Sequence, residues 1–258
     1  MQMKFSSARL VGLSIVAGAG LASSAFAQVS NPALTLSASN GSGTFSTTVL
    51  FSSFTATTFA SQPAWEYTLP AQDLFDGPNF VARLDAPLFI RYTSESTGQH
   101  RQQINALNFT VKSGSSDTTF SILTGVLSFS PLTNLMALAT TGATLTDTGS
   151  GSAAVTGLHS GGKMYRANFN GAIPGGTAFA LLNGSFNATG VNGSNTQSDS
   201  INPSVAVAGS ASNIQAEWAF KLSASDSFGV TSRYQMVPAP AGLVLIAGGL
   251  LGASRRRR

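Results

Sequence analysis

The segment Ile104-Asn105-Ala106-Leu107-Asn108-Phe109-Thr110-Val111 alternates between apolar and polar side chains. Successive side chains of an extended strand point to opposite faces, so Leu107, Phe109 and Val111 share one face. Ala106, Asn108 and Thr110 share the other. One apolar face and one polar face are typical of an antiparallel sheet that covers a core on one side only. The segment therefore predicts a half-buried β-strand whose apolar face contributes to the core.

Short segments of similar strand chemistry recur between residues 28 and 236, and turn residues separate nearly all of them. Asn40-Gly41-Ser42-Gly43 predicts a hairpin, and Asp76-Gly77-Pro78-Asn79 predicts another turn. Only residues 132–138 fit a short helix, and residues 190–203 are expected to form a long surface loop. The predicted strands cover residues 33–37, 44–51, 54–59, 65–69, 80–84, 88–93, 104–112, 118–123, 126–129, 153–158, 164–170, 177–182, 185–189, 205–208 and 214–223. Many short strands without intervening helices predict an all-β fold, an antiparallel β-sandwich or jelly roll.

The composition restricts the class of protein. Lys4, Arg9 and the four C-terminal arginines account for six of the 14 basic residues, so eight basic residues face all ten acidic ones between the ends. This near-neutral balance removes the electrostatic argument for nucleic-acid binding. Cysteine is absent, which excludes disulfides and thiolate metal sites. Charged residues make up only 9% of the chain, against about 25% in ordinary soluble proteins. A neutral polar surface suits an exported adhesive or matrix protein better than a cytoplasmic enzyme.

The N-terminus has the three parts of a secretory signal peptide. Lys4 and Arg9 form a positive start, residues 10–22 are apolar, and Ala25-Phe26-Ala27 is an A-x-A cleavage site before Gln28. We therefore expect secretion machinery to recognise residues 1–27 and the mature protein to begin at Gln28. The alternative is an uncleaved N-terminal anchor.

The C-terminus also has three parts: Val237-Pro238-Ala239-Pro240, an uncharged run, and Arg255, Arg256, Arg257 and Arg258. As a helix, residues 241–253 span about 20 Å, short of a hydrocarbon core of about 30 Å, so the run is suited to transient membrane insertion. Arginines are retained on the cytoplasmic side, which places the chain before Val237 outside.

This tail resembles the PEP-CTERM sorting signal of Gram-negative and related bacteria, with Ala239 where that family usually has Glu. The resemblance covers residues 237–258. It implies that an exosortase, a membrane-embedded cysteine transpeptidase, removes the tail during delivery to the cell surface or extracellular matrix. The alternative is an ordinary tail anchor that is retained.

The strongest match to a catalytic motif is Asp147-Thr148-Gly149-Ser150, which has the D-T-G-S form found in aspartic proteases. That chemistry needs two carboxylates that share a proton, and the chain has one such motif. A turn made of small polar residues is the alternative interpretation, and the one we adopt.

Carboxylates also lie beside aromatic rings in Trp65-Glu66-Tyr67 and Glu217-Trp218, as in some sugar-cleaving sites. Strand alternation instead predicts that the rings face the core and the carboxylates face solvent. His100 and His159 have no partners at metal-ligand spacing. Asp73-Leu74-Phe75-Asp76-Gly77 lacks the pattern of a calcium loop, although one structural calcium at such a turn is left open. The N-x-[ST] triplets at Asn40, Asn108, Asn183, Asn187 and Asn192 are a hypothesis for glycosylation.

The sequence thus predicts a signal peptide over residues 1–27, a β-rich extracellular domain over 28–236 and a sorting signal with a hydrophobic helix over 237–258. The expected protein is structural or adhesive, contacts exopolysaccharide or the cell envelope, and is not an enzyme. No catalytic, cofactor or metal site is predicted. A carbohydrate-binding β-sandwich module and a secreted hydrolase are the alternatives.

Overall fold

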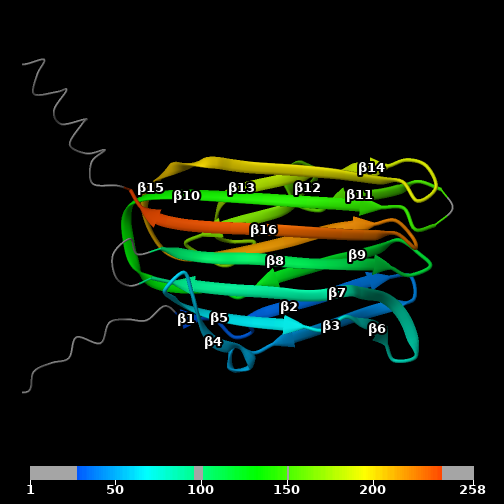
Figure 1. Ribbon diagram of the computed structural model, residues 1–258, viewed down its shortest axis with the longest axis horizontal. Helices are drawn as coiled ribbons and strands as arrows, with labels where there is room; N and C mark the ends of the chain where they lie inside the picture. Colours follow the sequence, from blue (N-terminus) through cyan, green and yellow to red (C-terminus); the bar gives the residue numbers. More distant parts are fainter. Residues whose placement is uncertain (1–27, 96–100, 150, 240–258) are drawn as a thin grey trace, which may run out of the picture.

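The computed structural model describes residues 28–95, 101–149 and 151–239, and these residues form an all-β, antiparallel structure (Figure 1). Two single 3-10 turns, Phe51–Ser53 and Ser160–Gly162, are the helical elements in this part of the chain. The strands are β1 (Gln28–Val29), β2 (Leu34–Asn40), β3 (Gly43–Val49), β4 (Thr55–Phe59), β5 (Gln62–Leu69), β6 (Gln72–Asp76), β7 (Asn79–Ser94), β8 (Gln102–Ser113), β9 (Thr118–Thr124), β10 (Leu127–Thr146), β11 (Ala153–Gly157), β12 (Lys163–Phe169), β13 (Thr177–Gly184), β14 (Phe186–Ala188), β15 (Ser194–Leu222) and β16 (Ser227–Pro238).

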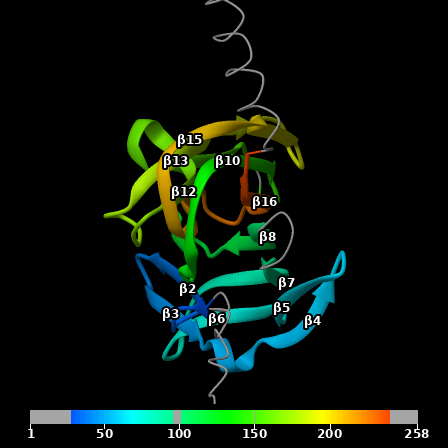
Figure 2. The same ribbon diagram turned by 90° about the vertical axis from the view of Figure 1, so that its left-hand side faces the viewer.

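The long strand β15 connects two parts of one continuous sheet, whose main path runs β3-β2-β9-β15-β10-β16-β8-β7-β5-β4. The first half of β15 pairs with β10, while the second half pairs with β9 on one edge and with β12 and β11 on the other. We call β4, β5, β7, β8, β16, β10 and the first half of β15 the front layer. The back layer contains β3, β2, β9, the second half of β15, β12 and β13. Figure 2 shows β15 curving from one layer to the other.

The core lies between the two layers. Phe109 of β8 stacks on Phe220 of β15 with ring centroids 6.4 Å apart, and Phe179 of β13 stacks on Tyr234 of β16 at 5.6 Å. Trp218 is fully buried, and its indole N–H donates to Ser232 Oγ of the opposite layer at 3.1 Å. Burial of large rings between facing sheets is the main source of stability in such a fold, because apolar area leaves water.

Several expectations from the sequence are confirmed. Leu107, Phe109 and Val111 are buried while Asn108 is exposed, as the alternation predicts. The Asn40–Gly43 hairpin joins β2 to β3, with Asn40 paired to Gly43. The turn at residues 76–79 joins β6 to β7 in the same way. Two pairs of predicted strands merge: 80–84 with 88–93 in β7, and 205–208 with 214–223 in β15.

The prediction of a helix over residues 132–138 is wrong, because these residues belong to β10. Leu135 and Ala137 are buried, and Met136 and Leu138 lie on the outer face. Leu, Met and Ala favour helices in isolation, but here β15 pairs with one edge of β10 and β16 with the other. Hydrogen bonding on both edges outweighs a helix preference of a few tenths of a kcal/mol per residue.

The prediction of a long loop over residues 190–203 is also wrong from Ser194 onward, where β15 begins. The serines and threonines of this segment alternate with larger side chains that face inward. Ser194, Thr196 and Ser198 are exposed, whereas Gln197, Asp199 and Ile201 are half-buried. Pro203 lies opposite an irregularity in the pairing with β10, at an edge where the sheet tolerates a missing N–H.

Residues 1–27, which were predicted to be a signal peptide, lie outside the described residues, as do Pro240 and Arg255 to Arg258. Gln28 is the first residue of β1 and pairs with Ser128 of β10. The domain boundary expected after Met236 falls inside β16, because Val237 and Pro238 pair with Met136 and Leu135. Ala239 then donates its backbone N–H to the Asn134 carbonyl at 2.5 Å. Within the described ranges, no helix is long and apolar enough to cross a bilayer.

Candidate functional site

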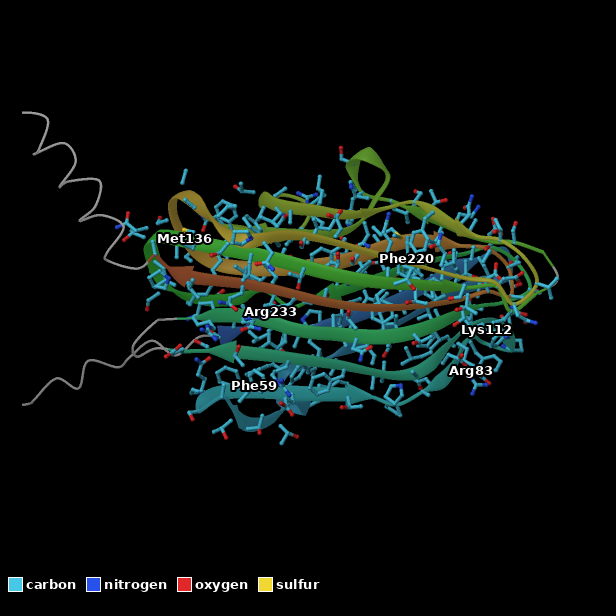
Figure 3. All side chains as sticks on the ribbon, turned by 45° about the horizontal axis from the view of Figure 1, so that its top comes forward. Phe59, Arg83, Lys112, Met136, Phe220 and Arg233 are labelled. Carbon is cyan, nitrogen blue, oxygen red and sulfur yellow. The ribbon has the colours of Figure 1, made fainter. Side chains whose placement is uncertain are left out.

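One end of the molecule has an open cleft with a volume of about 830 Å³, which we call the end cleft. Four segments form it: the β6–β7 hairpin, the end of β8 with its following turn, the chain just after β10, and the β15–β16 turn. Figure 3 shows Arg83 and Lys112 at this end and Met136 at the other. The lining residues are Asp73, Phe80, Arg83, Lys112, Ser113, Gly114, Ser115, Thr148, Gly149 and Ser225.

The end cleft combines opposite charges, hydroxyl groups and an exposed ring. Arg83 lies between Asp73 and Asp85, with N–O distances of 3.7 and 3.2 Å, and its side chain is 50% exposed. Lys112 is the register partner of Arg83 on the neighbouring strand. The ring of Phe80 is 41% exposed and meets Phe75 edge-on at 5.7 Å. Such a surface can hold a polar ligand with one apolar face, as a sugar has.

The Asp147-Thr148-Gly149-Ser150 motif forms part of this end, up to Ser150, which lies outside the described residues. Thr148 and Gly149 line the cleft, while Asp147 is only 1% exposed. Asp147 Oδ1 accepts the backbone N–H of Gly149 at 2.8 Å, which is the turn expected from small polar residues. Its other oxygen, Oδ2, is buried as well.

The structure brings a second carboxylate, Asp226, to the same place. A β-carbon on Gly149 would lie 3.5 Å from Asp147 Oδ1 and 4.0 Å from Asp226 Oδ1, so both carboxylates face this glycine. Asp226 is 3% exposed and accepts hydrogen bonds from the Thr148 N–H, at 3.3 Å, and from the Ser223 hydroxyl. Burial raises the pKa of Asp226, and the neighbouring Asp147 raises it further through its charge and through a hydrogen bond between the two carboxyl groups.

We call Asp147 and Asp226 the carboxylate pair. The sequence did not reveal it, because residues 224–236 were not predicted as a strand and nothing placed Asp226 near residue 147. A hydrolase would need at least one of these carboxylates to reach a substrate. With 1% and 3% exposure, both lie beneath the surface of the end cleft. The geometry is therefore that of a buried structural pair.

The aromatic–carboxylate segments lie as the strand alternation predicts. Trp65 and Tyr67 pack against the core, and Glu66 on the opposite face pairs with Arg91 at 2.5 Å. Trp218 is fully buried, and Glu217 faces outward, where it accepts the Ser121 hydroxyl at 2.7 Å. Neither carboxylate therefore lies beside an exposed indole.

His159 lies over Glu217, with its Nε2 3.9 Å from Glu217 Oε2, and the two side chains are 9% and 15% exposed. Burial lowers the pKa of His159, and the Glu217 carboxylate partly opposes this shift.

His100 lies outside the described residues. In the part of the chain that is described, no three His, Asp or Glu side chains form a group that could hold a metal. Asp76 accepts the Thr44 N–H at 3.0 Å and thereby joins β6 to β3.

The five N-x-[ST] asparagines differ in accessibility. Asn183 is fully buried and hydrogen-bonded to Thr141, so a glycan cannot be attached there in the folded protein. Asn108, Asn187 and Asn192 are exposed, and Asn40 is half-buried, with its amide bonded to the Val81 carbonyl at 2.8 Å.

Serine and threonine side chains form rows across the outer faces of both layers, which we call the hydroxyl rows. On the back layer, cross-strand partners align as Thr48-Thr35, Ser46-Ser37-Ser121 and Thr44-Ser39-Thr119. On the front layer they align as Ser194-Thr146-Ser227, Thr196-Thr144-Gly229-Thr110 and Ser198-Gly142-Thr231. Neighbouring strands are about 4.8 Å apart, so these rows form regular hydrogen-bonding surfaces, two of which end at Lys221 and Lys112.

The front rows contain a shallow groove of about 330 Å³ where Gly142 and Gly229 replace side chains. We call it the glycine groove. A β-carbon on Gly142 would lie 3.0 Å from Thr231 Oγ1, and one on Gly229 would lie 3.2 Å from Thr110 Oγ1. Neither Gly142 nor Gly229 has a positive φ, so the backbone conformation at these two positions does not require glycine. Glycine inside a strand often marks a close approach by a ligand. The groove is lined by Asn108, Thr110, Gly142, Ala143, Thr144, Thr196, Gly229, Val230 and Thr231.

Comparison with known proteins gives no family. No family model matches the chain, and no curated protein matches it. Among solved structures, a chain from a structure of infectious bursal disease virus, Gx strain, aligns with a TM-score of 0.23 and 11% identity. The alignment covers 82% of this chain but only 58% of the viral one. A TM-score this low carries no inference about fold or function.

Proposed function

We propose that the protein is an exported cell-surface or extracellular-matrix component of structural or adhesive type. Its fold is an antiparallel β-sandwich formed by the two layers. An exosortase-like enzyme processes its C-terminus while the tail transiently anchors the chain in the inner membrane of a Gram-negative-type bacterium. Its partner outside the cell is exopolysaccharide, and the role needs no catalysis.

The observation that carries the proposal is the regular pattern of hydroxyl rows on both outer faces. Polysaccharides present dense hydroxyl groups that hydrogen-bond well to such surfaces, directly or through water. Each contact is weak, so a broad array along a polymer is needed for useful avidity. The glycine groove lies within the front rows, and five of its lining side chains carry a hydroxyl or amide group.

The position of the ends supports the same role. Val237 pairs with Met136, which lies at the end of the molecule opposite Arg83 and Lys112 (Figure 3). A chain held at its C-terminus would therefore direct the end cleft away from the membrane, and both outer faces would be free to contact the matrix.

Fractionation of the producing cells tests this role. We expect the protein in the matrix fraction of the parent strain and in the free medium of a strain that makes no exopolysaccharide. Recovery from the cytosol of both strains would contradict the proposal.

Binding can then be assigned to the rows with purified exopolysaccharide. The double variant Gly142→Val, Gly229→Val places side chains in the glycine groove. We expect its affinity for exopolysaccharide, measured by co-sedimentation, to fall about threefold to tenfold, which is equivalent to losing one or two hydrogen bonds. Gly184→Val, in β13, is the matched control, because a β-carbon there meets nothing within 4 Å. Equal binding by all variants would remove the groove as the contact.

A second candidate, a carbohydrate-binding module, is favoured by one observation: the exposed ring of Phe80 at the end cleft. A sugar stacked on this ring would lose most of its affinity in Phe80→Ala. Phe59→Ala is the matched control, because Phe59 is also 41% exposed but lies under Arg91. If Phe80→Ala abolishes co-sedimentation and the glycine variants do not, the single-site module replaces the matrix-contact interpretation.

A further inference from the structure

Arg233 lies on the outer face of the front layer, beside the glycine groove. Its neighbours Ser232 and Tyr234 are buried in the core, so Arg233 shares the outer face with Thr231. Thr231 lines the groove, and two residues along a strand span about 7 Å. The side chain of Arg233 is exposed, and Figure 3 shows it on the front layer, away from the end that carries Lys112.

No carboxylate in the described part of the chain contacts the Arg233 guanidinium, because none of the ion pairs there involves it. The guanidinium donates instead to Gln235 Oε1, a neutral group that orients the charge without cancelling it. Partial burial lowers the pKa of Arg233, and the positive charge of Arg101 lowers it further. Arginine nevertheless stays protonated at neutral pH, because its ordinary pKa is above 12. The groove therefore has a cation at its edge.

The acidic side chains on the neighbouring strands are already bound to cations. The row of Arg233 continues through Asn105 and Arg91 to Glu66, which Arg91 contacts at 2.5 Å. Asp199, in the first half of β15, faces inward, where Lys163 lies 3.7 Å from its carboxylate. An anion that lies along the glycine groove therefore meets hydroxyl groups and a guanidinium, and both of these carboxylates are neutralised.

Arg233 and the groove offer two kinds of recognition side by side. A guanidinium presents N–H donors in a planar fork that fits both oxygens of a carboxylate. The groove beside it is lined by hydroxyl and amide side chains, and Gly142 and Gly229 leave space above the sheet. A sugar acid has the matching parts, since it carries a carboxylate on a ring rich in hydroxyl groups.

We propose that the polysaccharide bound in the glycine groove is acidic, and that Arg233 binds a carboxylate of its sugar acids. This inference rests on the proposed function and names the chemistry of its ligand. The sugar rings lie in the groove, and a carboxylate reaches the guanidinium about 7 Å further along β16. Hydrogen bonds between charged groups are about twice as strong as neutral ones, so Arg233 supplies a selectivity that hydroxyl groups alone do not.

The test compares two forms of one polymer, the native exopolysaccharide and the same material after its carboxyl groups are chemically reduced to alcohols. Both are titrated against full-length protein in mild detergent. Every sample has Gln in place of the four C-terminal arginines, so that the tail does not bind polyanions. We expect the reduced polymer to bind about tenfold more weakly, equivalent to losing one hydrogen bond to a charged group. This comparison needs no substitution in the folded domain.

Variants then assign the preference to one residue. Arg233→Gln should bind both forms of the polymer equally, and Arg233→Lys should keep part of the preference, because it retains the charge but not the planar fork. Lys221→Gln is the matched control, since it removes one positive charge from the back layer. Lys221 is 50% exposed and lies 2.8 Å from Asp117, and its variant should keep the full preference.

Two results would overturn the inference: equal binding of both polymer forms by the parent protein, or a preference that persists in Arg233→Gln. In either case, weaker binding by the double variant Gly142→Val, Gly229→Val would still support the groove as a matrix contact. Failure of the parent protein to bind the native exopolysaccharide would overturn both the inference and the proposed function.

Discussion

His159 shows how a single buried group can make this sparsely charged protein sensitive to pH. Its imidazole packs against the outer face of the back layer beside Glu217 and is 9% exposed. Its Nε2 has no hydrogen-bond partner among the described residues. Removing an imidazolium from water is costly, so burial favours the neutral ring and lowers the pKa of His159. The Glu217 carboxylate at 3.9 Å offsets only part of this cost.

The lowered pKa of His159 has a defined consequence for stability. The unfolded chain binds a proton near pH 6.5 while the folded protein does not, so stability is present above that pH and falls as the pH drops toward the folded pKa. We expect His159→Gln to flatten the loss of melting temperature between pH 7 and pH 5. Thermal melts of both proteins across this range are the measurement. A parent protein that gains stability between pH 7 and pH 5 would contradict the assignment.

At the scale of elements, strand chemistry predicted most of the fold but not its longest strands. Segments with apolar alternation, such as Thr118–Thr124, were found almost to the residue. Residues 194–204 of β15 were missed because the outer residues there are small and polar, a composition typical of loops. Alternation was present there, in the larger side chains at residues 195, 197, 199 and 201.

Strand β16 was missed for a different reason. Phe228, Val230, Tyr234 and Met236 alternate and are buried, but Ser232 interrupts the apolar pattern on their face. Pairing with β10 and β8 determines this strand, and a local pattern does not reveal partners over 80 residues away. The carboxylate pair depended on that pairing, since β16 is what brings Asp226 to Asp147. The sequence therefore indicated only Asp147 of the candidate site, through the D-T-G-S turn, and did not indicate Asp226.

The topology predicts which strands open most easily. β10 pairs on both edges along most of its length, whereas the first half of β15 pairs only with β10, and β4 only with β5. We expect amide hydrogen exchange to be about tenfold or more slower over residues 135–146 than over 194–205 and 55–59. Equal protection in all three segments would mean that the edges are covered by a partner in solution.

At the scale of the whole molecule, the fold extends into the segment that the sequence assigned to the sorting tail. Val237 and Pro238 complete the pairing of β16 with β10, and Ala239 adds a hydrogen bond to Asn134. Strand β16 therefore reaches into the proline motif. Processing that preserves the fold has to occur after these residues.

Two truncated chains test this boundary. A chain ending at Met236 loses these contacts, and we expect it to be less stable than a chain ending at Ala239 by about 1–2 kcal/mol, the value of one or two hydrogen bonds. Urea denaturation of both proteins gives the difference. Equal midpoints would show that the last three residues contribute nothing to the fold.

The proposed function requires that the protein is exported and processed at both ends. The most direct test is the intact mass of the protein recovered from the cell surface and the medium, compared between the parent strain and a strain without the exosortase-like enzyme. We predict a mature chain that begins at Gln28, ends after Ala239 and lacks Arg255 to Arg258, with the arginines retained only when the enzyme is absent. Surface protein that still carries Arg255 to Arg258 in the parent strain would contradict the account.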